Sequence, residues 1–132
     1  MLNDTYIYPA LFTYENDGIS IEFPDLEGCL SCANNEFEAV KNAKEAMSLF
    51  LYDLEQDNKE LPEPSKLSEI KLQENQTMIP IEVWMPYYRG LVKTVYVKKT
   101  LTIPNWLNVL AEHNQINFSQ VLQTALKERL NV

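Results

Sequence analysis

The chain has 132 residues, of which 45% are hydrophobic and 23% are charged, and its formal net charge is −8. This composition is typical of a folded protein and excludes a long disordered chain, which would be poorer in apolar residues. No apolar stretch approaches the length of a membrane span, and the first residues show no basic segment followed by an apolar run. We therefore expect a cytoplasmic protein with no membrane partner.

The charge is distributed unevenly along the chain. Residues 1–88 carry 5 lysines and 17 acidic residues, a net charge of −12, whereas residues 89–132 carry 6 basic and 2 acidic residues, a net charge of +4. We predict two domains with these limits, the first with a basic partner and the second with a polyanion. A solvated acidic surface is the plainer explanation for the first domain.

Three short strands are expected before residue 34. Residues 6–14 are rich in aromatic and aliphatic side chains, residues 15–18 (ENDG) offer a turn, and apolar and polar residues alternate over 19–23. The sequence PDLEG at 24–28 then breaks the second strand, and residues 29–33 are long enough for a third.

The cysteines and the histidine do not predict a metal site. Cys29 and Cys32 are the only cysteines and His113 is the only histidine, so one chain cannot supply the four ligands of a structural zinc ion. We interpret the two thiols as reduced side chains that fill small spaces in a sheet, and we expect no metal and no cofactor.

A long helix and a fourth strand complete the first domain. Asn35 and Glu38 have the spacing of a capping box, and apolar residues then recur at helical spacing to about Gln56. These residues are Val40, Ala43, Met47, Phe50, Leu51 and Leu54. Prolines interrupt the pattern before a possible short helix at 65–72, and residues 78–85 predict a strand in which Pro80 suits an edge or the strand's start. The expected order is β-β-β-α-β.

The basic region predicts one strand and two helices. Residues 86–90 (PYYRG) are interpreted as a hinge, and residues 91–103 are rich in Thr, Val and Tyr and are expected to form a strand. Pro104 opens a helix that stops near residues 114–115, and Asn117 and Gln120 predict the cap of a second helix.

Some forty residues cannot enclose a core alone, so a second copy must complete this module. If the two strands pair antiparallel, Leu101 and Ile103 face the helices while Lys98, Thr100 and Thr102 point outward on a ribbon that fits the major groove of DNA. Backbone N–H groups at Phe118 and Ser119 are candidates for binding a phosphate. The alternative is a dimerisation module with incidental lysines.

Three segments resemble the HicB-type antitoxins of HicA/HicB toxin–antitoxin systems, in their ribbon-helix-helix variant. They are YPALFTYENDGISIEFPDLEGC at 8–29, EFEAVKNAKEAMSLFL at 36–51 and KKTLTIPNWL at 98–107. Where the family usually has Gln and Asp before the helix, this chain has Cys32 and Asn34. Contacts carried by those positions are not expected to be the same.

The resemblance implies an α+β protein with a trimmed RNase H-like first domain and a ribbon-helix-helix second domain. The first would mask a small basic ribonuclease toxin of the HicA type, and the second would bind operator DNA and repress the shared operon. Asp25 and Glu27 become candidate contacts for the toxin's positive active site; solvation of a turn is the competing explanation. The size of the second domain predicts the homodimer, and the sequence leaves further pairing into tetramers open.

Two other functions compete with this interpretation. A residual metal-dependent nuclease would need converging carboxylates, and the predicted first strand at 6–14 carries none, so we expect no catalytic residue and no enzyme. A ligand-sensing transcriptional regulator without a toxin partner remains the other alternative.

Overall fold

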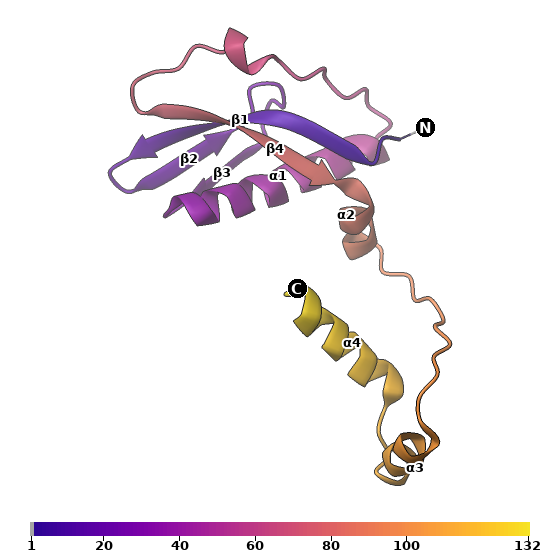
Figure 1. Cartoon of the computed structure of the whole chain (residues 1–132). Coiled ribbons are helices and arrows are strands. Elements are labelled where there is room, and N and C mark those ends of the chain that lie inside the picture. Colours follow the sequence, from indigo (N-terminus) through magenta and orange to yellow (C-terminus); the bar gives the residue numbers. More distant parts are fainter. Residues whose placement is uncertain (1) are drawn as a thin grey trace. The chain divides into compact units, whose positions relative to one another are not determined.

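The computed structural model describes residues 2–132, which divide into two compact units, one extending to Val95 and the other comprising Tyr96–Val132 (Figure 1). A four-stranded sheet and two helices make up the first unit, and two helices make up the second, so the chain is α+β as expected. Within 2–132, no helix combines the length and apolar character needed to cross a bilayer. The first unit continues beyond residue 88, and a division of tasks at that residue stays a prediction.

The sheet has strand order β3-β2-β1-β4, with every neighbouring pair antiparallel. Its strands are β1 (Thr5–Glu15), β2 (Gly18–Glu22), β3 (Leu30–Ala33) and β4 (Gln76–Trp84). Gly18 ends the β1–β2 turn at φ +146°, and a Cβ atom there would lie 2.7 Å from the carbonyl oxygen of Ala33. A glycine is therefore required for the close approach of β3.

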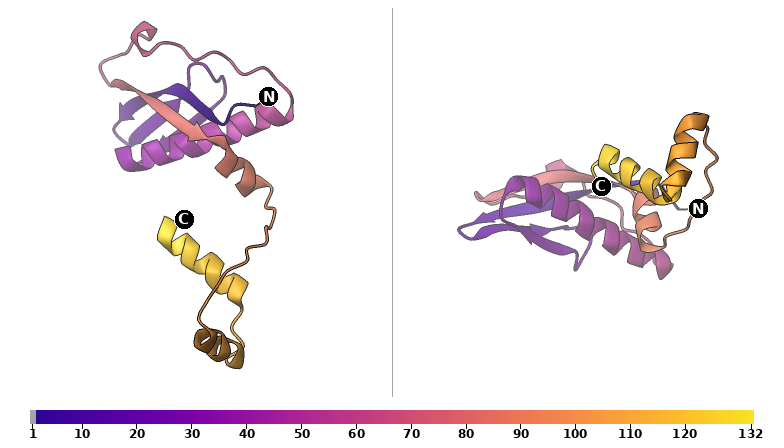
Figure 2. Two further views of the ribbon diagram at one scale, coloured as in Figure 1. Left: turned by 45° about the vertical axis from the view of Figure 1, so that its right-hand side comes forward. Right: turned by 90° about the horizontal axis from the view of Figure 1, so that it is seen from below.

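Helix α1 (Glu36–Gln56) packs on one face of the sheet (Figures 1 and 2). Its start confirms the predicted cap, because the side-chain oxygen of Asn35 accepts a hydrogen bond from the N–H of Glu38 at 2.9 Å. The Glu38 carboxylate accepts in return from the N–H of Asn34, at 3.3 Å, and not from that of Asn35. The cap thus satisfies one unpaired donor of the first helical turn, and the Glu38 carboxylate ties the residue before the cap to the helix.

One stripe of α1 fills the core. Ala39 and Ala43 come first, and their small side chains bring the helix close to the sheet before Met47 and Leu51 follow. Val40, which the sequence pattern predicts to be buried, is 39% exposed because the stripe begins one residue earlier, at Ala39. The sheet residues packed in the same cluster are Tyr8, Ala10, Phe12, Ile19, Ile21, Ala33, Ile81 and Val83.

The connection from α1 to β4 lies on the side of the sheet opposite α1 (Figures 1 and 2). It contains one short 3-10 helix, η1 (Leu67–Glu69), inside the predicted range 65–72. The Tyr8 hydroxyl donates to the carbonyl oxygen of Pro62, which ties the connection to β1. β4 is an edge strand, which confirms the position predicted from Pro80.

β4 runs directly into helix α2 (Met85–Val92), and two predictions are wrong here. Residues 86–90 form a helix and not a hinge, and Leu91 lies in that helix and does not begin a strand. Pro86 stands in the first turn, where a missing N–H costs no helical hydrogen bond. Met85 is fully buried and its N–H donates to the carbonyl oxygen of Asp4 at 2.6 Å, so α2 is anchored to the first unit.

The second unit contains both predicted helices, α3 (Asn105–His113) and α4 (Phe118–Leu130). The Asn117 side chain caps α4 by accepting from the N–H of Gln120 at 3.1 Å. The strand predicted up to residue 103 is not formed, because a strand needs the backbone of a neighbour and this unit offers none to residues 96–104. None of the residues 96–132 is buried in the single chain.

Candidate functional site

Arg89, which the sequence groups with the basic region, is held inside the first unit. Its Nε and Nη2 donate to the two carboxylate oxygens of Glu55 at 3.0 and 2.7 Å, and the Glu55 side chain is only 1% exposed. Nη2 also donates to the carbonyl oxygen of Asn3 at 2.7 Å, and Nη1 lies 3.3 Å from Asp4. The hydrogen bonds that Arg89 donates to Glu55 raise the pKa of Arg89, and the carboxylate neutralises this positive charge within the first unit.

The positive excess of the second unit is consequently smaller than the sequence division suggests. Its charged side chains are Lys98, Lys99, Lys127 and Arg129 against Glu112 and Glu128. Two of the four cations, Lys98 and Lys99, stand together in the segment before α3. A polyanion that binds this unit must therefore meet that segment or the end of α4.

The loop between β2 and β3 contains the two acidic residues proposed from the sequence, and they differ. Asp25 is half-buried and accepts two hydrogen bonds from Ser65, one from its N–H at 2.9 Å and one from its hydroxyl. Glu27 is exposed. Asp25 thus fastens the α1–β4 connection to this loop, while Glu27 is left for an external contact. A role of either residue in toxin binding stays a prediction.

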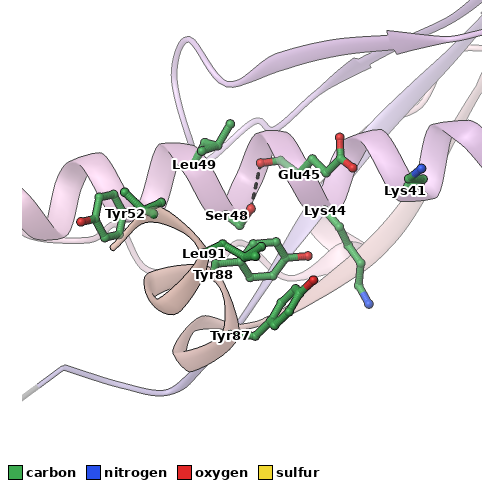
Figure 3. A pocket seen from close by; sticks show the side chains of 10 residues that line it. Lys41, Lys44, Glu45, Ser48, Leu49, Tyr52, Tyr87, Tyr88 and Leu91 are labelled. Atoms are coloured by element: carbon green, nitrogen blue, oxygen red, sulfur yellow. Dashed lines mark hydrogen bonds between the residues drawn. The ribbon is translucent and has the colours of Figure 1, made fainter. Parts of the chain in front are cut away.

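An open groove of about 410 Å³ lies between α1 and α2 (Figure 3). Lys41, Lys44 and Leu49 line it from α1, and Tyr88 and Leu91 line it from α2. Burial raises the pKa of Tyr88. Sequence reasoning missed this groove because it placed a hinge where α2 lies; the spacing of the tyrosines and Leu91 was the available signal.

The two cysteines occupy different environments. Cys29 is buried, and burial raises its pKa to about 11, as expected for a thiol that fills space. Cys32 is exposed, so the prediction that both thiols fill the sheet is wrong for this one. Among residues 2–132, no three His, Cys, Asp or Glu side chains gather in a way that could hold a metal ion.

In the second unit, alternate residues of the segment before α3 face the helices. Lys99, Leu101 and Ile103 line an open apolar groove of about 1080 Å³ together with side chains of α3 and α4. The intervening residues Lys98, Thr100 and Thr102 are exposed and do not line this groove. The period of two expected for a strand is present, although no strand has formed.

The start of α4 lies at the same groove. Phe118 and Ser119 line it, and the cap uses only the N–H of Gln120. The N–H groups of Phe118 and Ser119 have no partner among the described residues 2–132, as is usual for the first turn of a helix. Phosphate binding at these two N–H groups stays a prediction.

Comparison with known proteins identifies similar chains over most of this length. A model of the HicB-like antitoxins of bacterial toxin–antitoxin systems matches residues 8–126. The chain is also 35% identical over 91 residues to an uncharacterised 14.9 kDa protein from the rep–hol intergenic region of Haemophilus phage HP1. That match covers 67% of this chain and 58% of the phage protein.

Two solved structures are similar to the chain. A chain of a toxin–antitoxin complex from Streptococcus pneumoniae is 27% identical, with a TM-score of 0.61, over 95% of this chain and 99% of its own length. A chain of a HicA3 and HicB3 toxin–antitoxin complex is 27% identical, with a TM-score of 0.50, over 59% of this chain and 98% of its own. The first of these similarities includes both units.

Proposed function

The chain belongs to the HicB-like family of antitoxins of bacterial toxin–antitoxin systems, and we propose that it neutralises a HicA-type ribonuclease toxin and represses its own operon. Membership in an antitoxin family agrees with a non-enzymatic role. The observation that carries the first half of the proposal is the similarity to chains of toxin–antitoxin complexes, one of which contains HicA3.

The first unit is the toxin-binding part of this proposal. Its sheet with α1 on one face is compatible with a trimmed RNase H-like fold, and its acidic charge suits a basic ribonuclease. Glu27 is the acidic contact best placed for the toxin's positive active site, because its carboxylate is exposed. Asp25 contributes by holding the loop in place through Ser65.

The second unit is the DNA-binding part, and it requires a second copy. Leu101 and Ile103 already face α3 and α4, yet they remain 63% and 41% exposed in the single chain. Antiparallel pairing of two such segments would bury them and satisfy their backbone N–H and C=O groups. The result is a ribbon-helix-helix homodimer in which Lys98, Thr100 and Thr102 of each chain face the major groove.

The proposal is tested by co-expression of the full chain with a HicA-type toxin, which we expect to be a small basic protein encoded beside its gene. We expect the two proteins to purify together and the chain to restore growth that the toxin alone arrests. A DNA fragment from the shared promoter should bind the chain in a titration, and a scrambled fragment of equal length should bind less tightly. Promoter binding without toxin binding would instead favour a ligand-sensing regulator.

A further inference from the structure

Helix α1 presents an exposed ridge of residues spaced four apart. Phe37, Lys41, Glu45 and Leu49 succeed one another along it, and all four are exposed. Phe37 is 83% exposed and Leu49 is 58% exposed, although both are large apolar side chains. Residues at this spacing are neighbours on a helix surface and form the ridges through which helices pack.

Helix α2 covers only the C-terminal half of this side of α1. Ser48 and Glu55 are buried there, and the bond from Arg89 to Glu55 holds α2 in place. Phe37 lies on the same side as Ser48, since eleven residues are close to three helical turns. On this side, the N-terminal half of α1 is therefore not covered by α2, and the groove of Figure 3 lies where the cover by α2 ends.

We propose that the ridge binds the same ridge of a second copy of this chain, with the two α1 helices antiparallel. A twofold axis at the level of Ala43, on the exposed side of the helix opposite this buried residue, places Phe37 against the partner's Leu49 and Lys41 against the partner's Glu45, each contact occurring twice. The order along the ridge is apolar, positive, negative, apolar, which is complementary to itself when reversed. Such self-complementarity is what a twofold interface between identical chains requires.

The charges on the ridge are free for this contact. The ion pairs formed among residues 2–132 are Lys59–Asp57, Arg89–Asp4 and Arg89–Glu55, and none involves Lys41 or Glu45. In one helix, a Lys that precedes a Glu by four residues is the less favourable order for pairing. Because the first unit is strongly acidic, most of its surface would repel a second copy. At the ridge, by contrast, Lys41 of each copy meets Glu45 of the other.

The groove beside Leu49 provides space for the partner's Phe37. Leu91 and Val92 line its α2 side, so an aromatic ring that meets Leu49 is also shielded by apolar side chains of α2 (Figure 3). Ridges of residues four apart pack with the helices crossing at about −50°. This interface is separate from the one proposed for the second unit. It either links two such dimers or forms a second contact between the two chains of one dimer.

Disulfide trapping in the full-length protein tests this arrangement. In a Cys32→Ser background, Phe37→Cys and Leu49→Cys are combined and the protein is mildly oxidised; Cys29 stays silent because it is buried with a pKa of about 11. We expect a covalent dimer. The two positions lie about 18 Å apart along one helix, beyond the roughly 7 Å limit between the Cα atoms of a disulfide, so no bridge forms within one chain.

The matched controls are the two single-cysteine variants, for which the twofold axis places like positions about 18 Å apart as well. Equal yields of covalent dimer from the double and single variants would overturn the proposal. Charge provides an independent check in the double-cysteine protein. Lys41→Glu and Glu45→Lys should each lower the yield several-fold, and together they should restore it, while Lys71→Glu on the α1–β4 connection should change nothing. Failure of the combined exchange to restore the yield would also overturn it.

Discussion

The two units of the chain bury their apolar residues to very different extents. In the first, Phe12 and Met47 are fully buried between sheet and helix, whereas in the second Leu107 and Leu110 are 42% and 53% exposed. Both sets of residues recur at the spacing of their secondary structure. The difference lies in the layers: the first unit has a sheet and a helix to close against each other, and the second has two short helices with nothing opposite them.

The largest expected effect comes from Leu101→Asp. A carboxylate in the proposed dimer core costs several kcal/mol, so DNA affinity should fall on the order of 100-fold or more. The second unit should also no longer dimerise. Sedimentation equilibrium and a promoter titration measure the two effects. Leu30→Asp, the same change at a 67% exposed leucine of β3, is the control and should leave both unchanged. Because the α1 ridge offers a second contact between copies, the sedimentation experiment is done in a Lys41→Glu background. A Leu101→Asp protein that is still dimeric in that background would contradict the incomplete state of the second unit.

The complementary test destabilises the first unit, which folds without a second copy. Arg89→Met leaves the buried carboxylate of Glu55 without its partner, and the free energy of unfolding of this unit should fall by about 3–5 kcal/mol. Each unit contains one tryptophan, so urea unfolding followed by Trp84 fluorescence in a Trp106→Phe background reports the first unit alone. Lys93→Met, at an exposed cation just after α2, should have little effect.

The ion pair between Arg89 and Glu55 also indicates where the chain can be truncated without loss of the first unit's fold. A fragment of residues 1–95 keeps Arg89 and should unfold cooperatively and retain toxin binding. A fragment of residues 1–88 loses the guanidinium and part of α2, and should be less stable. Equal unfolding midpoints for the two fragments would show that α2 is dispensable for the fold.

The loop acids sharpen the distinction between holding the fold and binding a partner. Asp25→Ala removes both hydrogen bonds from Ser65. Bonds to a charged acceptor are worth about 1.5–3 kcal/mol each, so the free energy of unfolding should fall by about 3 kcal/mol or more. Glu27→Ala should leave stability unchanged and weaken toxin binding. Urea unfolding and a toxin-binding titration on both variants separate the two roles; stability loss in Glu27→Ala would refute this assignment.

On the DNA side, smaller effects are expected from the outward residues. Lys98→Ala should reduce the slope of log affinity against log salt concentration by about 2 per dimer, since each lost phosphate contact contributes about 0.9. Thr102→Ala should relax sequence preference by about 1–3 kcal/mol for each base contact. Titrations at two salt concentrations against matched and altered sites measure both. Parent-like binding by both dimeric variants would exclude the ribbon as the reading surface.

The smallest effect concerns Cys29. Burial raises its pKa from 9.0 to about 11, so the folded chain keeps a proton that the unfolded chain releases. Its contribution to stability is therefore complete below pH 9, falls as the pH rises above 9, and levels off beyond about 11. At pH 8, alkylation should modify one thiol per folded chain, Cys32, and a second only in urea. Two modified thiols in the folded protein would contradict the burial of Cys29.

What the sequence determined by itself are the features set by neighbours along the chain. Hydrophobic alternation and turn residues predicted the strands, and the Asn35 and Asn117 caps predicted where α1 and α4 begin. The alternation of Lys98, Thr100 and Thr102 with Leu101 and Ile103 likewise needed only the period of an extended chain.

Only the tertiary structure decided the features set by residues far apart in the chain. Pro86 and Gly90 locally favour a break, yet the ion pair between Arg89 and Glu55, 34 residues apart, holds that segment as α2. Asp25 lies in a sequence typical of a solvated turn, yet it accepts hydrogen bonds from Ser65, 40 residues away, and so holds two segments together. The free energy of such contacts depends on burial and on partners that local periodicity does not specify, which is why a strand without a neighbour remains unformed at residues 96–104.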